Sequence, residues 1–307
     1  MAAVHHPVAD ASESSPFGDL SPAEFYSRHN VAHSTSSFLN PDNLRIFTQT
    51  WTPLPPTPII GTVCVVHGFT GESSWFVQLT SVLLAEHGFA VCALDHMGHG
   101  FSDGLHSHIP DIRPVVRDCV SAFTSFRSSY ASLPSFLYSE SLGGAIALLI
   151  HLAGGGAGEW QGIVLNGAMC GISAKFKPPW PLEHLLSVAA AVMPTWQVVP
   201  TRGSIPAQEL VRVCREVQSR FEEVTVPFLI VHGEEDVVCD PACAMDLYRR
   251  ARSEDKTIKI YPGLWHQLVG ESNEDVDKVF GDVVNWLKER ALRADAAAGD
   301  KSVAEGI

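Results

Sequence analysis

Short, continuous runs of apolar residues alternate with longer segments of helical periodicity along most of this chain. A strand that is apolar at every position is buried on both faces, which is typical of parallel strands in a sheet covered by helices on both sides. The alternation therefore predicts an α/β fold with a mostly parallel central sheet. The predicted strands are Leu44–Trp51, Ile59–Val66, Phe89–Leu94, Pro134–Tyr138, Ile163–Leu165, Val226–Val231 and Thr257–Tyr261, and the predicted helices are Trp75–His87, Asp111–Tyr130, Ser141–Leu152, Pro241–Arg252 and Asn273–Leu292.

One stretch interrupts this alternation. Residues 167–222 contain no convincing strand, but they contain an apolar helical pattern around 183–193 between proline-containing segments. We interpret this stretch as a small helical cap inserted into the sheet domain. The chain then divides into a flexible N-terminal tail (1–20), a first part of the core (21–166), the helical cap (167–222), a second part of the core (223–292) and a flexible C-terminal tail (293–307).

The strongest local motif is Tyr138-Ser139-Glu140-Ser141-Leu142-Gly143-Gly144, in which a strand ends, a turn carries a serine and a helix of small residues begins. This is the context of a nucleophile elbow, which holds the serine hydroxyl at the carboxyl edge of a sheet. The positive end of the following helix favours negative charge at that point. Ser141 is therefore the candidate nucleophile, and a surface serine on an ordinary turn is the alternative for the motif alone.

A serine hydroxyl needs a base and an acid that orients the base. Asp236 follows the predicted strand Val226–Val231, and His266 follows the strand Thr257–Tyr261. Both therefore lie at the same sheet edge as Ser141, in the order Ser, Asp, His that is typical of α/β-hydrolases. We predict that the three form a catalytic triad, with Glu235 and Asp240 as alternatives for the acid.

Backbone amides that could bind an oxyanion lie beside this predicted triad. The segment His67-Gly68-Phe69 follows the strand Ile59–Val66, and Gly68 allows a close backbone turn. We expect the N–H groups of Phe69 and of Leu142, the residue after the nucleophile, to form the oxyanion hole. A simple strand-to-loop turn is the alternative for His67-Gly68.

Composition excludes several classes of function. The chain carries 34 Asp and Glu against 21 Lys and Arg, a net charge of −13, and this acidity argues against nucleic acid as a partner. No apolar run is long enough to span a bilayer, so only a weak peripheral membrane contact remains open. The polar start has no features of a secretory signal, and seven scattered cysteines indicate reduced thiols in a cytoplasmic protein.

No cofactor or metal is predicted. His96, His99, His106 and His108 lie in one loop rich in glycine and histidine, but no carboxylate or cysteine is spaced with them as in a zinc site. A phosphate-binding glycine loop is also missing from the sequence. We interpret the histidine loop as a rigid structural segment.

The motifs together resemble the plant monoacylglycerol lipase-like group of α/β-hydrolases, which includes caffeoylshikimate esterases. The resemblance covers about residues 22–292 and implies an α/β-hydrolase fold with Ser141 as nucleophile, Asp236 and His266 as its partners and the amides of Phe69 and Leu142 as oxyanion donors. It rests on His67-Gly68-Phe69, Ser73-Ser74-Trp75, Leu94-Asp95-His96-Met97-Gly98-His99-Gly100-Phe101-Ser102-Asp103-Gly104, Ser139-Glu140-Ser141-Leu142-Gly143-Gly144, Lys175-Phe176-Lys177-Pro178-Pro179-Trp180-Pro181, Val199-Pro200-Thr201-Arg202-Gly203-Ser204-Ile205-Pro206 and Tyr261-Pro262-Gly263-Leu264-Trp265-His266.

Two positions depart from the family pattern. Ser139 stands where the elbow motif has its first glycine, and only Ala207 and Gln208 separate Arg202-Gly203-Ser204-Ile205-Pro206 from the helix that follows, where relatives have an additional basic stretch. The cap is therefore expected to be short. Its apolar residues either form the substrate wall or pack the cap onto the body; those assigned to substrate binding are Trp180, Leu185, Leu186 and Trp196.

The predicted reaction is hydrolysis of a small carboxylic ester through an acyl-enzyme. A monoacylglycerol is the first candidate substrate, and a phenolic or aryl ester, such as caffeoyl shikimate or a benzyl ester of an aromatic acid, is the alternative. Transfer of the acyl group to an alcohol instead of water, and a non-catalytic receptor that uses the fold as a binding pocket, are the other hypotheses. The sequence does not predict the oligomeric state.

Overall fold

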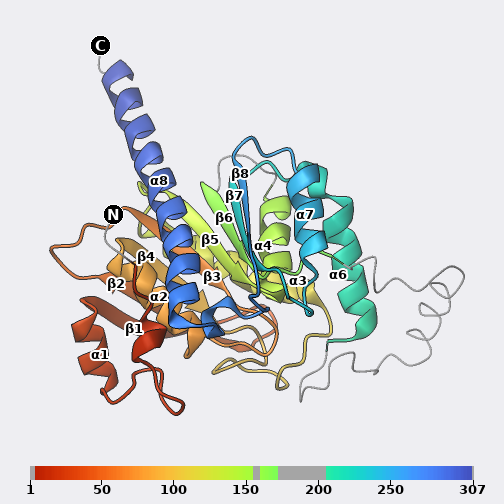
Figure 1. Cartoon of the computed structure of the whole chain (residues 1–307), viewed down its shortest axis with the longest axis horizontal. Helices are drawn as coiled ribbons and strands as arrows, with labels where there is room; N and C mark the ends of the chain where they lie inside the picture. Colours follow the sequence, from red (N-terminus) through yellow and green to blue (C-terminus); the bar gives the residue numbers. More distant parts are fainter. Residues whose placement is uncertain (1–3, 155–159, 172–204, 306–307) are drawn as a thin grey trace, which may run out of the picture.

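The described residues form an eight-stranded sheet at the core of the fold, seen in the computed structural model in Figure 1. The structure describes residues 4–154, 160–171 and 205–305. The strands follow the order β1-β2-β4-β3-β5-β6-β7-β8 across the sheet. Their bounds are Val31–Leu39 (β1), Arg45–Pro53 (β2), Gly61–Val66 (β3), Phe89–Leu94 (β4), Ser135–Glu140 (β5), Gly162–Asn166 (β6), Phe228–Gly233 (β7) and Lys256–Tyr261 (β8).

The strands from β3 to β8 are mutually parallel, whereas β1 and β2 form an antiparallel pair at one edge. The predicted α/β fold with a mostly parallel sheet is confirmed. Each of the seven predicted strands corresponds to an observed strand, with ends that agree or differ by at most two residues. The sequence analysis did not predict β1, whose middle is polar and exposed.

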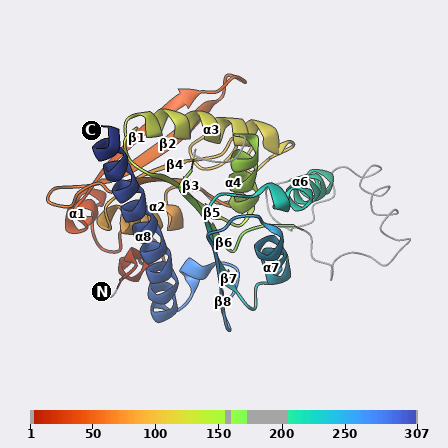
Figure 2. The same cartoon turned by 90° about the horizontal axis from the view of Figure 1, so that it is seen from above.

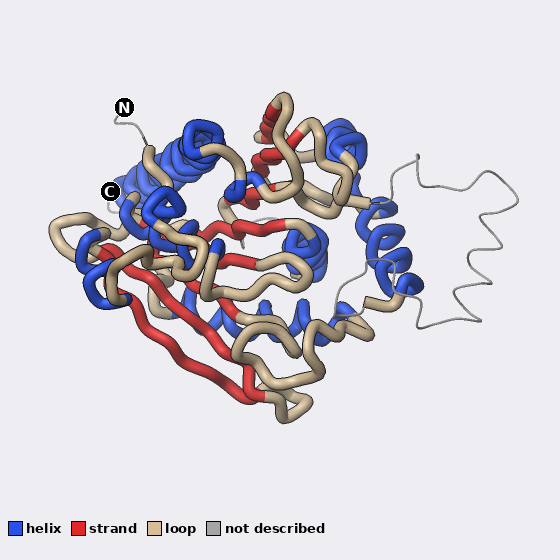
Figure 3. The backbone as a smooth tube through the Cα atoms, turned by 60° about the horizontal axis from the view of Figure 1, so that its bottom comes forward, coloured by secondary structure: helices blue, strands red, loops and turns tan. Residues whose placement is uncertain are grey.

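Helices cover both faces of the sheet, as Figures 2 and 3 show. Along β3, Cys64 and Val66 face one hydrophobic core, while Val63 and Val65 face the other, because side chains alternate between the two faces of a strand. The first core is closed by α3, α4, α6 and α7, and the second by α1, α2 and α8.

The α-helices are Pro22–Arg28 (α1), Phe76–Glu86 (α2), Ile112–Ser128 (α3), Leu142–Ala153 (α4), Ala207–Ser219 (α6), Pro241–Arg250 (α7) and Asn273–Glu305 (α8). Short 3₁₀ helices span Pro7–Asp10 (η1), Phe221–Glu223 (η3) and Leu268–Gly270 (η4). None of the described helices combines the length and apolar character needed to cross a membrane.

The N-terminal segment differs from the flexible tail expected for residues 1–20. Its described part packs on the body through His6, which is buried and whose backbone N–H donates to Asp277 of α8 over 2.8 Å. The His6 ring lies 4.4 Å from the ring of Phe280, and burial lowers the pKa of His6 to about 3. These contacts join residues that are far apart in sequence, so local composition did not reveal them.

The C-terminal segment also differs from expectation. A flexible tail was expected for residues 293–307, but α8 continues as a helix to Glu305. Its last part contains several alanines, which have the highest helix propensity. In Figure 1 this part of α8 extends beyond the sheet.

Only the ends of the expected cap, 167–222, are described. They contain α6 and η3 and no strand. Val213 and Val217 of α6 pack in the core that α4 closes, and Glu209 Oε1 accepts a hydrogen bond from the backbone N–H of Ile112 over 2.8 Å. The described part of this stretch is therefore attached to the body. Residues 172–204, with the predicted substrate-wall residues Trp180, Leu185, Leu186 and Trp196, lie outside the described residues.

Candidate active site

Ser141 occupies a sharp turn between β5 and α4. It directly follows the last residue of β5 and precedes the first residue of α4, with φ 51° and ψ −121°. A positive φ is rare for a residue other than glycine and is often found where function requires it. Because the backbone turns so sharply, the Ser141 hydroxyl lies at the carboxyl edge of the sheet and at the positive end of α4.

Close packing around the elbow explains two of its sequence features. A Cβ atom on Gly143 would lie 2.2 Å from the backbone oxygen of Val66, so only glycine fits there without movement of the backbone. Ser139, which replaces the first glycine of the motif, is fully buried, and its hydroxyl donates to the backbone oxygen of Val164 in β6 over 2.9 Å. The elbow therefore accommodates a serine at position 139 by adding a bond between β5 and β6.

The structure brings the predicted triad residues together. His266 Nε2 lies 2.9 Å from Ser141 Oγ, and His266 Nδ1 lies 2.7 Å from Asp236 Oδ2. Asp236 comes three residues after the end of β7, and His266 comes five residues after the end of β8. The alternatives for the acid lie elsewhere, because Glu235 is exposed and Asp240 accepts a hydrogen bond from the Ala242 amide at the start of α7.

Four nitrogen donors surround the Asp236 carboxylate. The backbone amides of Val238 and Cys239 each lie 2.8 Å from Oδ1, and His232 Nε2 lies 3.0 Å from Oδ2, the oxygen that also receives His266. Burial acts to raise the pKa of Asp236, but the hydrogen bonds from His232, His266 and the Cys239 amide outweigh it and hold this pKa well below its usual range.

Sequence reasoning missed His232. This side chain is completely buried, and its Nε2 also lies 2.7 Å from the backbone oxygen of Cys239. The available signal was a histidine near the end of the strand that leads to Asp236, four residues before it. A histidine at that position can donate a hydrogen bond to the Asp236 carboxylate.

The loop after β3 brings the predicted oxyanion donor Phe69 into the same pocket as Ser141. A Cβ atom on Gly68 would lie 3.0 Å from Ser141 Cβ, so a residue without a side chain allows this close approach. No described residue accepts a hydrogen bond from the backbone amide of Phe69 or of Leu142. Both amides are therefore available to a ligand.

Buried histidines hold this loop. His67 Nδ1 donates to the backbone oxygen of Gly68 over 2.7 Å, and His67 Nε2 accepts from the backbone N–H of His96 over 3.0 Å. Burial, and then the neighbouring His96 and His99, hold the pKa of His67 well below its usual range. A neutral ring with its proton on Nδ1 is the form that makes both bonds.

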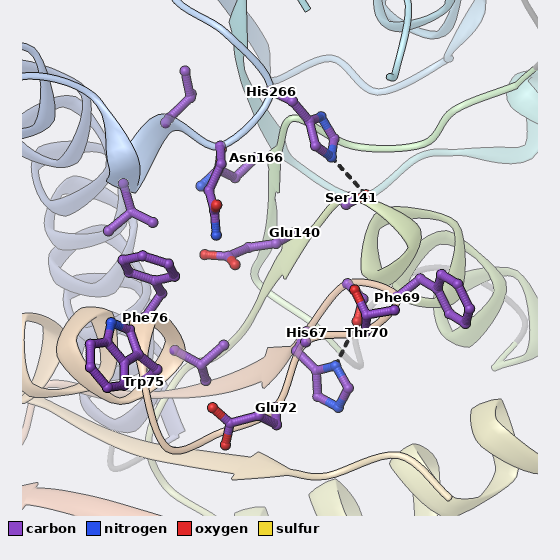
Figure 4. Close-up of a pocket in the computed structure, with 16 residues that line it drawn as sticks. His67, Phe69, Thr70, Glu72, Trp75, Phe76, Glu140, Ser141, Asn166 and His266 are labelled. Atoms are coloured by element: carbon purple, nitrogen blue, oxygen red, sulfur yellow. Dashed lines mark hydrogen bonds between the residues drawn. The ribbon is translucent and has the colours of Figure 1, made fainter. Parts of the chain in front are cut away.

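A pocket of about 610 Å³ opens beside Ser141. Figure 4 shows Trp75 and Phe76 on the side of the pocket formed by α2, and Glu140 and Asn166 between them and His266. Leu268 and Val269 add apolar surface. The pocket therefore combines aromatic and aliphatic side chains with a similar number of polar ones, which suits a small organic ligand that has both apolar and polar groups.

The histidine loop after β4 is part of the protein's packing. His96 and His99 are buried, and the ring of His96 lies 3.8 Å from that of His67. The described residues contain no group of three or more His, Cys, Asp or Glu arranged to hold a metal ion. All seven cysteines are free and buried.

A mostly parallel sheet that presents a serine on such an elbow, with a histidine and an aspartate after later strands, is the arrangement of α/β-hydrolases. The chain is a serine hydrolase with this fold. A family described as serine aminopeptidase, S33 (Hydrolase_4), matches residues 57–208 and 204–273, and the chain belongs to this family.

Individual relatives agree with this assignment. The chain is 30% identical to the caffeoylshikimate esterase of Arabidopsis thaliana, over 90% of this chain and 92% of the relative. It is also 30% identical to human monoglyceride lipase, over 85% of this chain and 92% of the relative. A solved structure of a soluble variant of the Saccharomyces cerevisiae monoglyceride lipase superposes with a TM-score of 0.67 at 20% identity, over 83% of this chain and 94% of that chain.

Proposed function

We propose that this protein hydrolyses a small carboxylic ester through an acyl-enzyme formed on Ser141. The observation that carries the proposal is the continuous set of hydrogen bonds from Ser141 Oγ through His266 to Asp236, at 2.9 and 2.7 Å. This geometry allows the base to take the serine proton without rearrangement. The named relatives, an esterase and a lipase, support ester hydrolysis as the reaction.

Acylation follows from the arrangement of these residues. His266 Nε2 accepts the Ser141 proton while Oγ attacks the ester carbonyl carbon, and the amides of Phe69 and Leu142 bind the oxyanion that forms. The tetrahedral intermediate collapses, and the C–O bond to the alcohol breaks as His266 returns the proton to the leaving oxygen. Deacylation repeats these steps with water as the nucleophile, which releases the acid and restores Ser141.

Asp236 keeps His266 in the required state. Its carboxylate accepts the Nδ1 proton, so that Nε2 faces Ser141 with a free electron pair. Because the pKa of Asp236 is held well below its usual range, the group stays ionised throughout the working pH range and stabilises the imidazolium that forms during attack.

A fluorophosphonate probe tests the assignment of the nucleophile. We expect wild-type protein to be labelled on Ser141 and Ser141→Ala to lose both label and esterase activity. Ser139→Ala is the matched control, because it removes a hydroxyl two residues away that bonds to Val164 and does not contact His266. Retention of label and activity by Ser141→Ala would contradict the proposal.

For the substrate, we propose a monoacylglycerol or a similar small acyl ester. The aromatic walls at Trp75 and Phe76 support the second candidate, a phenolic or aryl ester. Hydrolysis rates for a monoacylglycerol, caffeoyl shikimate and a simple aryl ester separate the two candidates, with Ser141→Ala as the blank. Product analysis in the presence of glycerol or shikimate distinguishes hydrolysis from acyl transfer.

We propose the cytoplasm as the location, on the basis of seven free cysteines in the described structure. The net charge of −13 supports a small molecule, rather than nucleic acid, as the partner. A weak peripheral membrane contact is compatible with an ester of low solubility. Fractionation of cells that express the tagged full-length chain tests the location.

A further inference from the structure

Glu140 is the residue directly before Ser141, and the sequence motif assigned it no role. It is the last residue of β5 and one of the residues that line the pocket. In Figure 4 the Glu140 side chain points away from His266, toward the side of the pocket formed by Trp75 and Phe76. The two neighbouring side chains therefore serve different parts of the site.

One oxygen of the Glu140 carboxylate is held in place by the protein. Asn166 Nδ2 donates to the Tyr138 hydroxyl oxygen over 2.7 Å, and the Tyr138 hydroxyl lies 2.8 Å from Glu140 Oε1. A tyrosine hydroxyl has a single proton. Because Asn166 supplies its own proton, the Tyr138 proton is free for Glu140, and Oε1 is fixed as an acceptor.

The other oxygen has no such partner. Among the described residues, none donates a hydrogen bond to Glu140 Oε2. Burial raises the pKa of Glu140, while the Tyr138 hydrogen bond and the nearby His266 act in the opposite direction. Glu140 is a partly buried residue, and a carboxylate oxygen in such a place is costly to leave without a donor, so a ligand that brings one is favoured.

The second carboxylate that lines the pocket, Glu72, has both of its described donors on one oxygen and from one neighbouring residue. Glu72 Oε2 accepts hydrogen bonds from both the backbone N–H and the hydroxyl of Ser74. Much of the remaining wall on this side is apolar and is formed by Trp75, Phe76, Val77, Leu268 and Val269. Of the two glutamates that line the pocket, Glu140 is the one that directly precedes Ser141, so we assign it as the acceptor for a ligand bound at the nucleophile.

We propose that Glu140 binds a hydroxyl group of the substrate and selects esters that carry one. The class of substrate is then an ester with an apolar body and a free hydroxyl or phenol close to the scissile bond. This inference rests on the proposed ester hydrolysis at Ser141 and narrows its substrate. Glu140 acts by binding and takes no part in proton transfer to or from Ser141.

The test compares esters that differ by one hydroxyl. Propyl butyrate is the reference, 3-hydroxypropyl butyrate carries a hydroxyl in the alcohol half, and propyl 3-hydroxybutyrate carries one in the acyl half. The readout is the ratio of kcat/KM for each hydroxylated ester to that of the reference. A hydrogen bond to a charged group predicts a wild-type ratio of about 10 to 100 for the half that faces Glu140.

Three variants assign that ratio to Glu140. Glu140→Met, which is similar in length but has no strong acceptor, is expected to reduce the ratio to about 1, and Glu140→Gln to an intermediate value. Glu72→Gln, a carboxylate-to-amide change in the same pocket, is the matched control and is expected to keep the wild-type ratio. Labelling of Ser141 by a fluorophosphonate confirms that each variant is folded, and Glu140→Gln decides the matter if Glu140→Met is not labelled.

Two results would overturn the inference: wild-type ratios near 1 for both hydroxylated esters, or a hydroxyl preference that stays at the wild-type ratio in the folded Glu140 variants. Failure of the proposed function looks different, because wild-type protein would then hydrolyse none of the three esters and Ser141 would not be labelled. A preference lost in the Glu140 variants and kept in Glu72→Gln supports the assignment.

Discussion

Two carboxylates lie near Ser141, and their surroundings differ in kind. Asp236 has donors on both oxygens, two backbone amides on one and two histidines on the other. Glu140 has a single described donor, the Tyr138 hydroxyl, and its other oxygen is open. The pKa of Asp236 is lowered and that of Glu140 is raised. The surroundings of Asp236 therefore suit it to stabilise the positive charge that forms on His266, whereas those of Glu140 suit it to accept a hydrogen bond from a ligand.

The largest expected effect comes from changing Asp236. Asp236→Asn replaces the acceptor that faces His266 Nδ1 with an amide, which favours the wrong imidazole tautomer. We expect kcat to fall by about 10³- to 10⁴-fold. The matched change Glu140→Gln removes the other carboxylate. A fall in kcat for propyl butyrate as large as that of Asp236→Asn would contradict the different roles assigned to Asp236 and Glu140.

The second effect concerns His232, which we expect to position Asp236. His232→Leu removes the second donor to Oδ2, and we expect kcat to fall by about ten- to hundredfold because the carboxylate can rotate. The freed carboxylate also binds the protonated ring of His266 more strongly, so the acid limb of the pH–rate profile moves to higher pH. His232→Gln, which restores an N–H donor, is expected to recover part of both changes, whereas a merely structural role would leave the pH profile unmoved.

The two carboxylates are also expected to affect stability with opposite dependence on pH. The folded pKa of Asp236 lies below its ordinary value of 3.8, so its stabilising contribution is present above about pH 4 and is lost as the pH falls through the folded pKa. The folded pKa of Glu140 lies above its ordinary value of 4.5, so its contribution is complete below that pH and is lost as the pH rises through the folded pKa.

Urea unfolding between pH 2.5 and 7 measures this difference. The stability of wild-type protein relative to Asp236→Asn should increase as the pH rises to about 5, whereas its stability relative to Glu140→Gln should decrease above about pH 4.5. The same direction for both variants would contradict the assigned environments.

The smallest effect is expected for Tyr138→Phe. This change removes the donor to Glu140 Oε1 and leaves Asn166 Nδ2 without its acceptor. We expect the preference for hydroxylated esters to fall a few-fold, because Glu140 is less firmly oriented, while the wild-type acid limb of the pH–rate profile is retained. A change in the acid limb as large as that of His232→Leu would show that the two carboxylates are not independent.

The sequence was sufficient to predict the sheet and the meeting of Ser141, Asp236 and His266. Each residue follows a parallel strand, and parallel strands end at one edge, so chain order alone determines which loops meet. The sequence favoured Asp236 over Glu235 and Asp240, which lie in the same loop, and the structure shows the Asp236 side chain bonded to His266.

Features that depend on side-chain contacts between distant segments were not predictable in the same way. His232 and Glu140 lie next to the triad in sequence, but their roles depend on what surrounds them: Asp236 and Cys239 for the first, Tyr138 and the pocket for the second. The strand β1 was missed because its exposed Ser and Thr residues lack the apolar pattern by which the other strands were found.

The attachment of the first residues to α8 has a practical consequence. His5 and His6 both bond to Asp277, and the His6 ring covers Phe280, so the beginning of the polypeptide closes over a helix near its opposite end. Deletion of about the first ten residues would expose the Phe280 ring to water and remove the hydrogen bonds that hold this segment to α8. The thermal stability of the protein would then depend on an N-terminal segment that takes no part in the proposed reaction.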